Sequence, residues 1–344
     1  MISVILITYN GALYVEKAIQ SVINQTIDKS MLQLIIVDDN SLDNTVEIAK
    51  NYEEMYPDNI IIVQKQINTS IARDSSRDIG IEYSDGEYIM FLDQDDWYLP
   101  NAFDTLHKLM DEDENLDYIE YSFNYVDEHG MILRQHRGGR TGYRKCDIVS
   151  ERDRINLEIN KLLPCSSFVW SKIYRKSFLQ KYDIHHNMGE QYCGFGDNYF
   201  SGLVELNCTH FAYYYEPLMC YFVRNGSWSH AKKINDVNQL ERIKVGMVLH
   251  DECIRRGYDK SKPEVMEYIL FRVIYEKVFW KLLLGFEPIP FDILITLKEY
   301  IMMRFPNYKK NPLLKNRKQL EPLLYLLDFE WTPEFLNEIG RENK

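Results

Sequence analysis

Residues 86–97 read GEYIMFLDQDDW, in which an apolar run ends in a cluster of carboxylates. The run at 88–92 is uninterrupted, as expected for a strand that is covered on both faces of a parallel sheet. The runs at 2–7 and 32–37 have the same character, and segments with the apolar spacing of helices follow them. Strands that alternate with helices predict an α/β fold with a mainly parallel sheet and helices on both faces. The elements expected in this part are strands at 2–7, 32–37, 60–63 and 88–92 and helices at 13–24, 43–56 and 70–83.

The pattern changes after residue 115. Apolar and polar residues alternate over 119–125, which is typical of a strand with one face in water, so the sheet is expected to be mixed. Further strands are expected at 167–174 and 211–223 with a helix at 197–206 between them, and the apolar spacing is helical beyond residue 234. The residues expected on the wet face of the alternating strand are Glu120, Ser122 and Asn124.

The composition excludes several classes of protein. The 344 residues include 40 basic and 52 acidic side chains, which gives a formal net charge of −12, and no dense basic stripe stands out. Nucleic-acid binding depends on Lys and Arg, so nucleic acid is not expected as a partner. Six cysteines without a Cys-x-x-Cys pair predict reduced, mostly buried thiols. No apolar stretch reaches the length of a membrane span and no export signal is recognised, so we expect a cytoplasmic protein.

Short polar side chains follow three of the expected strands. The first strand runs into TYN at 8–10, the second into DDNS at 38–41, and the fourth into DQDD at 93–96. In open parallel sheets, ligands bind outside the carboxyl ends of the strands. We therefore interpret this edge of the sheet as a ligand site, although Asp, Asn and Ser are also common in turns and helix caps.

The segment 93–96 holds three carboxylates, those of Asp93, Asp95 and Asp96. Carboxylates this close repel one another unless a cation or hydrogen bonds compensate. Mn²⁺ or Mg²⁺ prefers oxygen ligands, needs only one or two carboxylates, and accepts water and phosphate oxygens at its other positions. The cluster therefore predicts a divalent cation and a ligand with phosphate groups, and a solvated acidic turn is the alternative. The sequence has no glycine-rich dinucleotide or phosphate-loop motif.

These segments together resemble the successive motifs of family 2 glycosyltransferases, which have the GT-A fold. The motifs of the first half are Ile2–Asn10, Ser21–Thr26, Ile35–Ser41 and Gly86–Trp97. Those of the second half are WSKIYR at 170–175, GFGDNYF at 194–200 and YFVRNGS at 221–227. The resemblance implies a GT-A domain over residues 1–225, with a donor half at about 1–115 and an acceptor half at about 116–225. An α-helical C-terminal region is expected over residues 226–344.

The family implies inverting transfer of a sugar from a nucleotide diphosphate donor, with a UDP-sugar favoured, and Mn²⁺ or Mg²⁺ as the cofactor. By resemblance, Tyr9 would stack on the nucleobase and Asp39 would accept a hydrogen bond from a uracil imide. Asp93 would reach the ribose, and Asp95 would bind the metal. The residues assigned to the nucleotide sugar are Thr8, Tyr9, Asn10, Asp39, Arg73, Arg77, Asp93 and Arg224.

The family also places a catalytic Asp after the second set of strands, and Asp197 matches it. Asp197 would be the general base that takes the proton of the acceptor hydroxyl. Gly196 stands where the family usually has Glu, and an Asp at the start of a helix is also a favoured N-cap.

Three more residues have open alternatives. Arg73 or Arg77 could contact the diphosphate, or both could be solvated, as arginines on exposed helices usually are. Arg224 and His230 lie in a segment that can fold over the donor in relatives. His230 would complete the metal shell there, and a surface or packing role is the alternative.

The C-terminal helices are rich in Tyr, Phe and Leu, which suits packing, acceptor binding or a homo-oligomer. The basic run at 309–318 could contact the inner face of an anionic membrane.

The Gln/Arg-x-x-Arg-Trp motif of processive synthases is missing, which favours single-sugar transfer. We therefore expect transfer to a glycan, lipid-linked or glycoprotein acceptor in bacterial surface polysaccharide or glycoconjugate synthesis. Two alternatives remain, an inactive GT-A domain that binds sugar nucleotides or assembles with partners, and a sugar nucleotidyltransferase.

Overall fold

The computed structural model of the chain divides into two compact units. The residues that the structure describes are 1–68, 76–138, 140–150, 153, 156–157, 168–189, 195–224, 236–286, 288–315 and 321–342. The first unit is made of Met1–Asp147, Phe168–Glu190 and Cys208–Ala231, and the second of Ile148–Ser167, Gln191–Asn207 and Lys232–Lys344. Helix α7 (Gly196–Asn207) is grouped with the C-terminal helices, and the predicted domain boundary at residue 225 stays a prediction.

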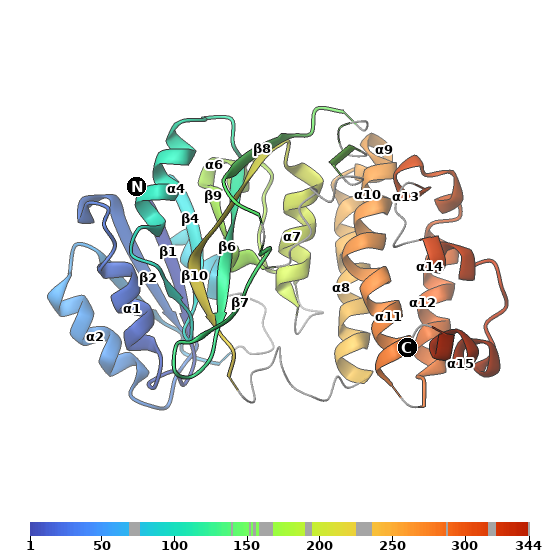
Figure 1. The fold of residues 1–344 in the computed structure, drawn as a ribbon, viewed down its shortest axis with the longest axis horizontal. Helices are drawn as coiled ribbons and strands as arrows, with labels where there is room; N and C mark the ends of the chain where they lie inside the picture. Colours follow the sequence, from blue (N-terminus) through green and yellow to red (C-terminus); the bar gives the residue numbers. More distant parts are fainter. Residues whose placement is uncertain are drawn as a thin grey trace. The chain divides into compact units, whose positions relative to one another are not determined.

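A mixed sheet forms the core of the first unit (Figure 1). Its strands run in the order β3-β2-β1-β4-β9-β6-β10-β5, with β7 paired to β6 and β8 paired to β10. Strands β3, β2, β1 and β4 are parallel, and β9 is antiparallel to both of its neighbours. The predicted mixed α/β sheet is therefore confirmed. The strands are β1 (Ile2–Thr8), β2 (Leu32–Asp38), β3 (Ile60–Gln64), β4 (Tyr88–Asp93), β5 (Trp97–Tyr98), β6 (Tyr118–Val126), β7 (Ile132–Gln135), β8 (Tyr143–Asp147), β9 (Lys172–Arg175) and β10 (His210–Phe222).

The helices of the first unit follow the strands as the apolar spacing predicts. In Figure 1, α1 and α2 lie side by side next to β1 and β2. Helix α3 approaches β1 closely at Gly80, where a Cβ would lie 2.2 Å from Ile5 Cγ2. Of the helix expected at 70–83, residues 70–75 lie outside the described part of the chain. The helices are α1 (Val15–Ile23), α2 (Thr45–Met55), α3 (Ser76–Glu82), α4 (Ala102–Asp111) and α6 (Lys176–Lys181).

The register of the parallel strands brings the predicted polar ends together. Thr8 at the end of β1 pairs with Asp38 at the end of β2, and Ile7 pairs with Asp93 at the end of β4. The apolar parts of these strands are buried, as expected for strands covered on both faces. The loops after β1, β2 and β4 therefore start at one edge of the sheet.

The expectation of a wet face on β6 is wrong. All nine residues of Tyr118–Val126 are buried, including Glu120 at 1% exposure. Glu120 forms ion pairs with Arg137 (2.6 Å) and Lys172 (3.8 Å), and the Ser122 hydroxyl donates to the carbonyl of His136. The alternation in β6 therefore reflects a face that is polar but buried. Its polar groups can be buried because side chains and carbonyls of other segments pair with them.

The second unit contains the predicted C-terminal helices. A π-helical turn, Phe271–Tyr275, joins α10 to α11, and the buried Arg272 in this turn forms an ion pair with Glu205 of α7. In the described part of the chain, no helix combines the length and apolarity that a membrane span needs. The helices are α7 (Gly196–Asn207), α8 (Asp236–Arg255), α9 (Tyr258–Ser261), α10 (Pro263–Leu270), α11 (Glu276–Gly285), α12 (Phe291–Arg304), α13 (Pro312–Lys315), α14 (Glu321–Leu326) and α15 (Pro333–Glu342).

Candidate active site

The loops that follow β1 and β4 are joined by the side-chain amide of Gln94. Its Oε1 accepts the Tyr9 N–H (2.8 Å), and its Nε2 donates to the Tyr9 carbonyl (3.1 Å). The amide fills the space beside Gly11, where a Cβ would lie 2.1 Å from Gln94 Oε1. The Tyr9 side chain stays 43% exposed, so its ring is open to solvent at the edge where a nucleobase is predicted.

The loops that follow β1 and β2 are joined by a second set of hydrogen bonds. Asn10 has a positive φ of 47°, its Oδ1 accepts the Leu42 N–H (2.8 Å), and its N–H donates to Ser41 Oγ (2.8 Å). The buried Asp38 carboxylate accepts the Ser41 N–H (2.8 Å) and the Thr8 hydroxyl (3.0 Å). Thr8 and Asn10, which are predicted to bind the nucleotide, thus hold the loops in place in this structure.

Asp39 has a basic partner that the sequence analysis missed. Lys65 Nζ lies 2.7 Å from Asp39 Oδ1, and their side chains are 9% and 17% exposed. The Asn68 amide donates to the Asp39 carbonyl (2.9 Å). Lys65 directly follows β3, so its position after the expected third strand was the signal that could have found it.

Two arginines face the carboxylates at the end of β4. Arg77 Nη2 lies 2.9 Å from Asp93 Oδ1, and Arg224 Nε lies 2.8 Å from Asp95 Oδ2. The structure therefore brings four predicted site residues together in two ion pairs. These pairs offset part of the repulsion between the neighbouring carboxylates.

Asp96 is the buried member of the cluster, with 1% of its surface exposed. Its Oδ1 accepts the Phe222 N–H (2.8 Å), and its Oδ2 has no hydrogen-bond partner among the described residues. Burial and the charges of Asp93 and Asp95 raise the pKa of the Asp96 carboxyl well above its usual value. The environment thus favours the neutral form of Asp96, which lowers the negative charge of the cluster.

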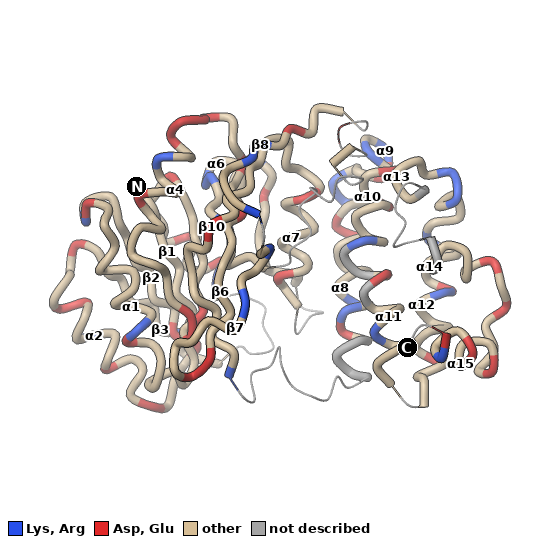
Figure 2. Tube along the Cα trace, in the orientation of Figure 1, with Lys and Arg blue, Asp and Glu red and all other residues tan. Residues whose placement is uncertain are grey.

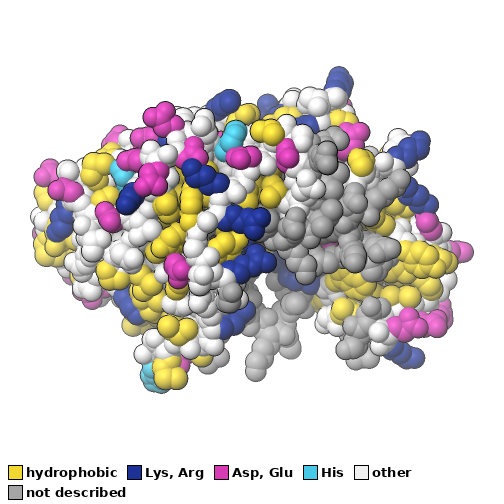
Figure 3. All heavy atoms as spheres, turned by 45° about the horizontal axis from the view of Figure 1, so that its top comes forward, with side chains coloured by type: hydrophobic (Ala, Val, Ile, Leu, Met, Phe, Trp, Pro, Cys, Tyr) yellow, Lys and Arg dark blue, Asp and Glu magenta, His cyan; other side chains and the backbone are white. Residues whose placement is uncertain are grey.

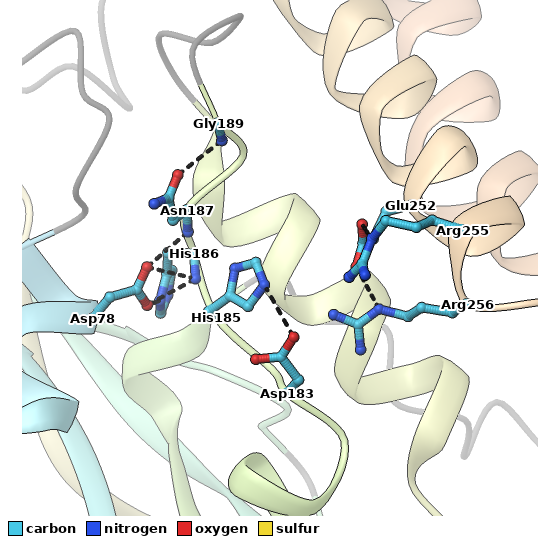
Figure 4. Close-up of polar contacts among 9 residues, drawn as sticks. All are labelled: Asp78, Asp183, His185, His186, Asn187, Gly189, Glu252, Arg255 and Arg256. Atoms are coloured by element: carbon cyan, nitrogen blue, oxygen red, sulfur yellow. Dashed lines mark hydrogen bonds and ion pairs between the residues drawn. The ribbon is translucent and has the colours of Figure 1, made fainter.

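Asp78 anchors a segment of the same unit, and the sequence analysis did not assign it a role. Figure 4 shows its carboxylate facing the backbone of residues 186 and 187. It accepts the N–H groups of His186 (2.8 Å) and Asn187 (2.7 Å), and the His186 ring nitrogen Nδ1 lies 3.1 Å away. Burial favours a higher pKa for Asp78, but these hydrogen bonds and the charge of His186 hold the pKa below its usual value. Asp78 follows Arg77, so α3 contacts both the acidic cluster and this segment.

The predicted base, Asp197, is the second residue of α7 and belongs to the second unit. It lies in the first helical turn rather than at the N-cap position. Its catalytic role stays a prediction. Arg73 and His230 lie outside the described residues.

The acidic cluster offers ligands that fit a hard divalent cation. The Asp93 and Asp95 side chains are 30% and 17% exposed, and the buried Asp96 Oδ2 has no hydrogen-bond partner in the described part of the chain. Within the same residues, no group of three or more His, Cys, Asp and Glu side chains could hold a metal by itself. These donors suit a cation that takes one or two carboxylates and completes its shell with water and phosphate oxygens.

The family model described as "Glycosyl transferase family 2" matches residues 3–182, which is more than half of the chain. The chain belongs to glycosyl transferase family 2. This family 2 enzyme is 28% identical over 283 residues to the uncharacterized glycosyltransferase YibD of Escherichia coli (strain K12), a match that covers 79% of this chain and 77% of YibD. It is 42% identical over 113 residues to the minor teichoic acid biosynthesis protein GgaB of Bacillus subtilis (strain 168). That match covers 33% of this chain and only 12% of GgaB.

The fold of this family 2 enzyme is similar to that of S. aureus TarS. The crystal structure of TarS 1–349 in complex with UDP-GlcNAc superposes with a TM-score of 0.55 at 18% sequence identity. The match covers 94% of this chain and 91% of the TarS chain. The predicted GT-A fold with C-terminal helices is confirmed.

Proposed function

We propose that this family 2 glycosyltransferase moves a single sugar from a UDP-sugar to a hydroxyl group of a cell-surface glycan, with inversion at the anomeric carbon. The observation that carries the proposal is the joining of the loops after β1, β2 and β4 at one edge of the sheet. Gln94, Asn10 and Asp38 join these loops beside the exposed ring of Tyr9. Ligands of open α/β sheets bind at such an edge.

A uridine nucleotide is the donor base that we propose. S. aureus TarS, which shares the fold, has been crystallised with UDP and with UDP-GlcNAc. The Tyr9 ring would stack on the base, and the Asp39 carboxylate, held by Lys65, would accept the imide N–H. Thr8 and Asn10 would shape this pocket through the hydrogen bonds that they already make.

Asp93 would contact the ribose, and Asp95 would hold Mn²⁺ or Mg²⁺, with His230 as a further ligand. When bound, such a cation neutralises the charge of the leaving diphosphate. Once Asp93 and Asp95 engage the ligand and the cation, Arg77 and Arg224 can turn to phosphate oxygens, which their planar forks suit. Arg73 is a further candidate for a diphosphate contact.

Asp197 would act as the general base. It takes the proton of the acceptor hydroxyl while the acceptor oxygen forms a bond to the anomeric carbon. The bond from that carbon to the diphosphate oxygen breaks, and its electron pair leaves with UDP. The motif around Asp197 supports this role, and so does its place in the first turn of α7, because a helix N-terminus stabilises a carboxylate.

The acceptor that we propose is a glycan of the bacterial surface, because GgaB is named for minor teichoic acid biosynthesis. A lipid-linked acceptor and a glycoprotein are the alternatives to be tested. The C-terminal helices are candidates for acceptor binding or for contact with a second copy of the chain.

The test is a turnover panel of UDP-, GDP- and dTDP-sugars with and without Mn²⁺, read by nucleoside diphosphate release and by the anomeric configuration of the product. We expect UDP release from one UDP-sugar, and a loss of about 100-fold or more in Asp197→Asn, as is common for a general base. Asp58→Asn, in the exposed turn between α2 and β3, is the matched control.

Three outcomes would overturn the proposal. Unchanged turnover in both Asp95→Asn and Asp197→Asn would remove the roles assigned to these residues. Donor binding without any turnover would favour an inactive GT-A domain. Release of pyrophosphate instead of UDP would favour a sugar nucleotidyltransferase.

A further inference from the structure

The segment from β7 to β8 carries a local positive charge. Residues 134–145 contain five basic side chains and no acidic one, in a chain whose net charge is −12. In Figure 2, Lys and Arg positions follow one another along this segment. Charge segregated in this way indicates an anionic partner. The basic residues are Arg134, Arg137, Arg140, Arg144 and Lys145.

Three of these arginines lie beside two tyrosines of β10. Arg137 Cζ lies 4.2 Å from the centre of the Tyr213 ring, and Arg140 Cζ lies 5.8 Å from the centre of the Tyr215 ring. Arg144 is the cross-strand partner of Tyr213 in the β8–β10 ladder, so the two share a face of the sheet. The rings of Tyr213 and Tyr215 stack with their centres 5.8 Å apart. We call Arg137, Arg140 and Arg144 the arginine surface.

A buried carboxylate lies beneath the arginine surface and is shared by two cations. The buried Glu120 carboxylate forms ion pairs with both Arg137 (2.6 Å) and Lys172 (3.8 Å). One carboxylate therefore faces two cations. Burial lowers the pKa of the nearby His136 to about 4. The charge of Glu120 favours a higher pKa for His136, and the charges of Arg137 and Lys172 favour a lower one.

The two outer arginines are free to contact a ligand. Arg140 and Arg144 are exposed, and neither forms an ion pair with a carboxylate of a described residue. The next residue, Lys145, differs, because its Nζ lies 2.8 Å from Asp113 Oδ2. Figure 3 shows Lys and Arg side chains gathered over this part of the sheet beside hydrophobic side chains.

We propose that the arginine surface binds phosphate groups of an anionic acceptor, a polymer of polyol or sugar units joined by phosphodiesters. This inference rests on the proposed function and names its acceptor class. Guanidinium groups bind phosphate oxygens through two parallel N–H bonds. The buried rings of Tyr213 and Tyr215 support Arg137 and Arg140 through cation–π contacts. A long nucleic acid suits the chain less well, because the acidic remainder of the surface repels a polyanion that extends beyond the arginine surface.

The test measures binding of a short synthetic poly(glycerol phosphate) to the full chain by fluorescence anisotropy over a series of salt concentrations. The double variant Arg140→Gln/Arg144→Gln is compared with Lys145→Gln, which removes a charge of the same segment that is already paired with Asp113. We expect the double variant to bind the polymer about tenfold more weakly than the unaltered chain. The slope of log Kd against log salt concentration should fall by roughly 1.4, that is, by about 0.7 for each lost phosphate contact. Lys145→Gln should bind like the unaltered chain.

Controls separate this site from its competitors and from the proposed function. An uncharged oligosaccharide of the same length should bind without salt dependence. The rate at which UDP is released from the UDP-sugar in the absence of polymer should be equal in the double variant and the unaltered chain. Equal polymer binding by the double variant would overturn the inference. Tighter binding of single-stranded DNA or of anionic vesicles than of the polymer would also overturn it. If no UDP-sugar is turned over but polymer binding still depends on Arg140 and Arg144, the proposed function fails and the anion site stands.

Discussion

Arg224 Nε lies 2.8 Å from Asp95 Oδ2, so the carboxylate predicted to bind a cation already has a positive partner. Two residues earlier, the Phe222 N–H donates to Asp96. The end of β10 is therefore tied to the acidic cluster at two points. A cation on Asp95 and the guanidinium of Arg224 compete for the same carboxylate.

The variant Arg224→Gln tests this competition. Without a cation, the variant should have a lower Tm than the unaltered chain, because Asp95 loses the partner that offsets its repulsion with Asp93. It should also bind Mn²⁺ more tightly, since the guanidinium that competes for Asp95 is gone. Thermal unfolding over a Mn²⁺ titration checks both effects. Arg255→Gln, which removes the exposed Arg255 from its pair with Glu252, is the control. Equal Mn²⁺ affinity in Arg224→Gln and the unaltered chain would contradict the competition.

The variant Asp78→Ala tests the anchoring of residues 186 and 187. Leaving two partly buried N–H groups unpaired should lower the free energy of unfolding by about 1–3 kcal/mol. The Asp78 pKa is lowered in the folded state, so its stabilisation is complete above the unfolded value near 3.8 and is lost as the pH falls through the lower folded value. Urea unfolding should therefore show a difference between the variant and the unaltered chain that shrinks below pH 4. A difference that stays constant into strong acid would refute the ionised anchor.

The variant Asp96→Asn tests the raised pKa of Asp96. A carboxyl whose pKa is higher in the folded state binds its proton more tightly there, so its contribution to stability falls as the pH rises above about 3.8. Asn can accept the Phe222 N–H without this pH dependence. We expect the Tm of Asp96→Asn, relative to that of the unaltered chain, to increase between pH 4 and pH 7. Asp58→Asn controls for the loss of a negative charge, and an equal pH trend in both variants would rule the explanation out.

Glu267 offers a pH test in the second unit. Burial raises the pKa of its carboxyl to about 7. The hydrogen bond that the buried Asn311 donates to Oε2 (2.7 Å) favours a lower pKa but is outweighed by burial. Stability from this group is present below the unfolded pKa of 4.5 and is lost as the pH rises through about 7. Glu267→Gln should therefore have a higher Tm than the unaltered chain at pH 8 and an equal one near pH 4.5. Equal Tm values at pH 8 would mean that the pKa of the Glu267 carboxyl is not raised.

The parallel strands and their polar ends could be predicted because each signal is local. A strand buried on both faces is an uninterrupted apolar run, as in Ile2–Thr8, and the residue after it must reach the edge of the sheet. The same local pattern could not tell Asp38 from Asp39. Asp38 turns inward to Ser41 and Thr8, whereas Asp39 pairs with Lys65 from another strand.

The missed features depend on partners that are distant in the sequence. Glu120 has the spacing of an exposed residue, and its burial is possible only because Arg137 and Lys172 reach it. In the same way, no pattern near Asp95 indicates its pair with Arg224. Ion pairs between remote segments follow from the packed fold and leave no periodic signal.

The most direct test of the account is calorimetric titration of UDP into the full chain with and without Mn²⁺, repeated with Asp95→Asn and the control Asp58→Asn. We predict that Mn²⁺ tightens UDP binding at least tenfold, or about 1.4 kcal/mol, in the unaltered chain and the control but leaves it unchanged in Asp95→Asn. Equal tightening in Asp95→Asn, or no UDP binding at all, would contradict a nucleotide and cation site at the end of β4.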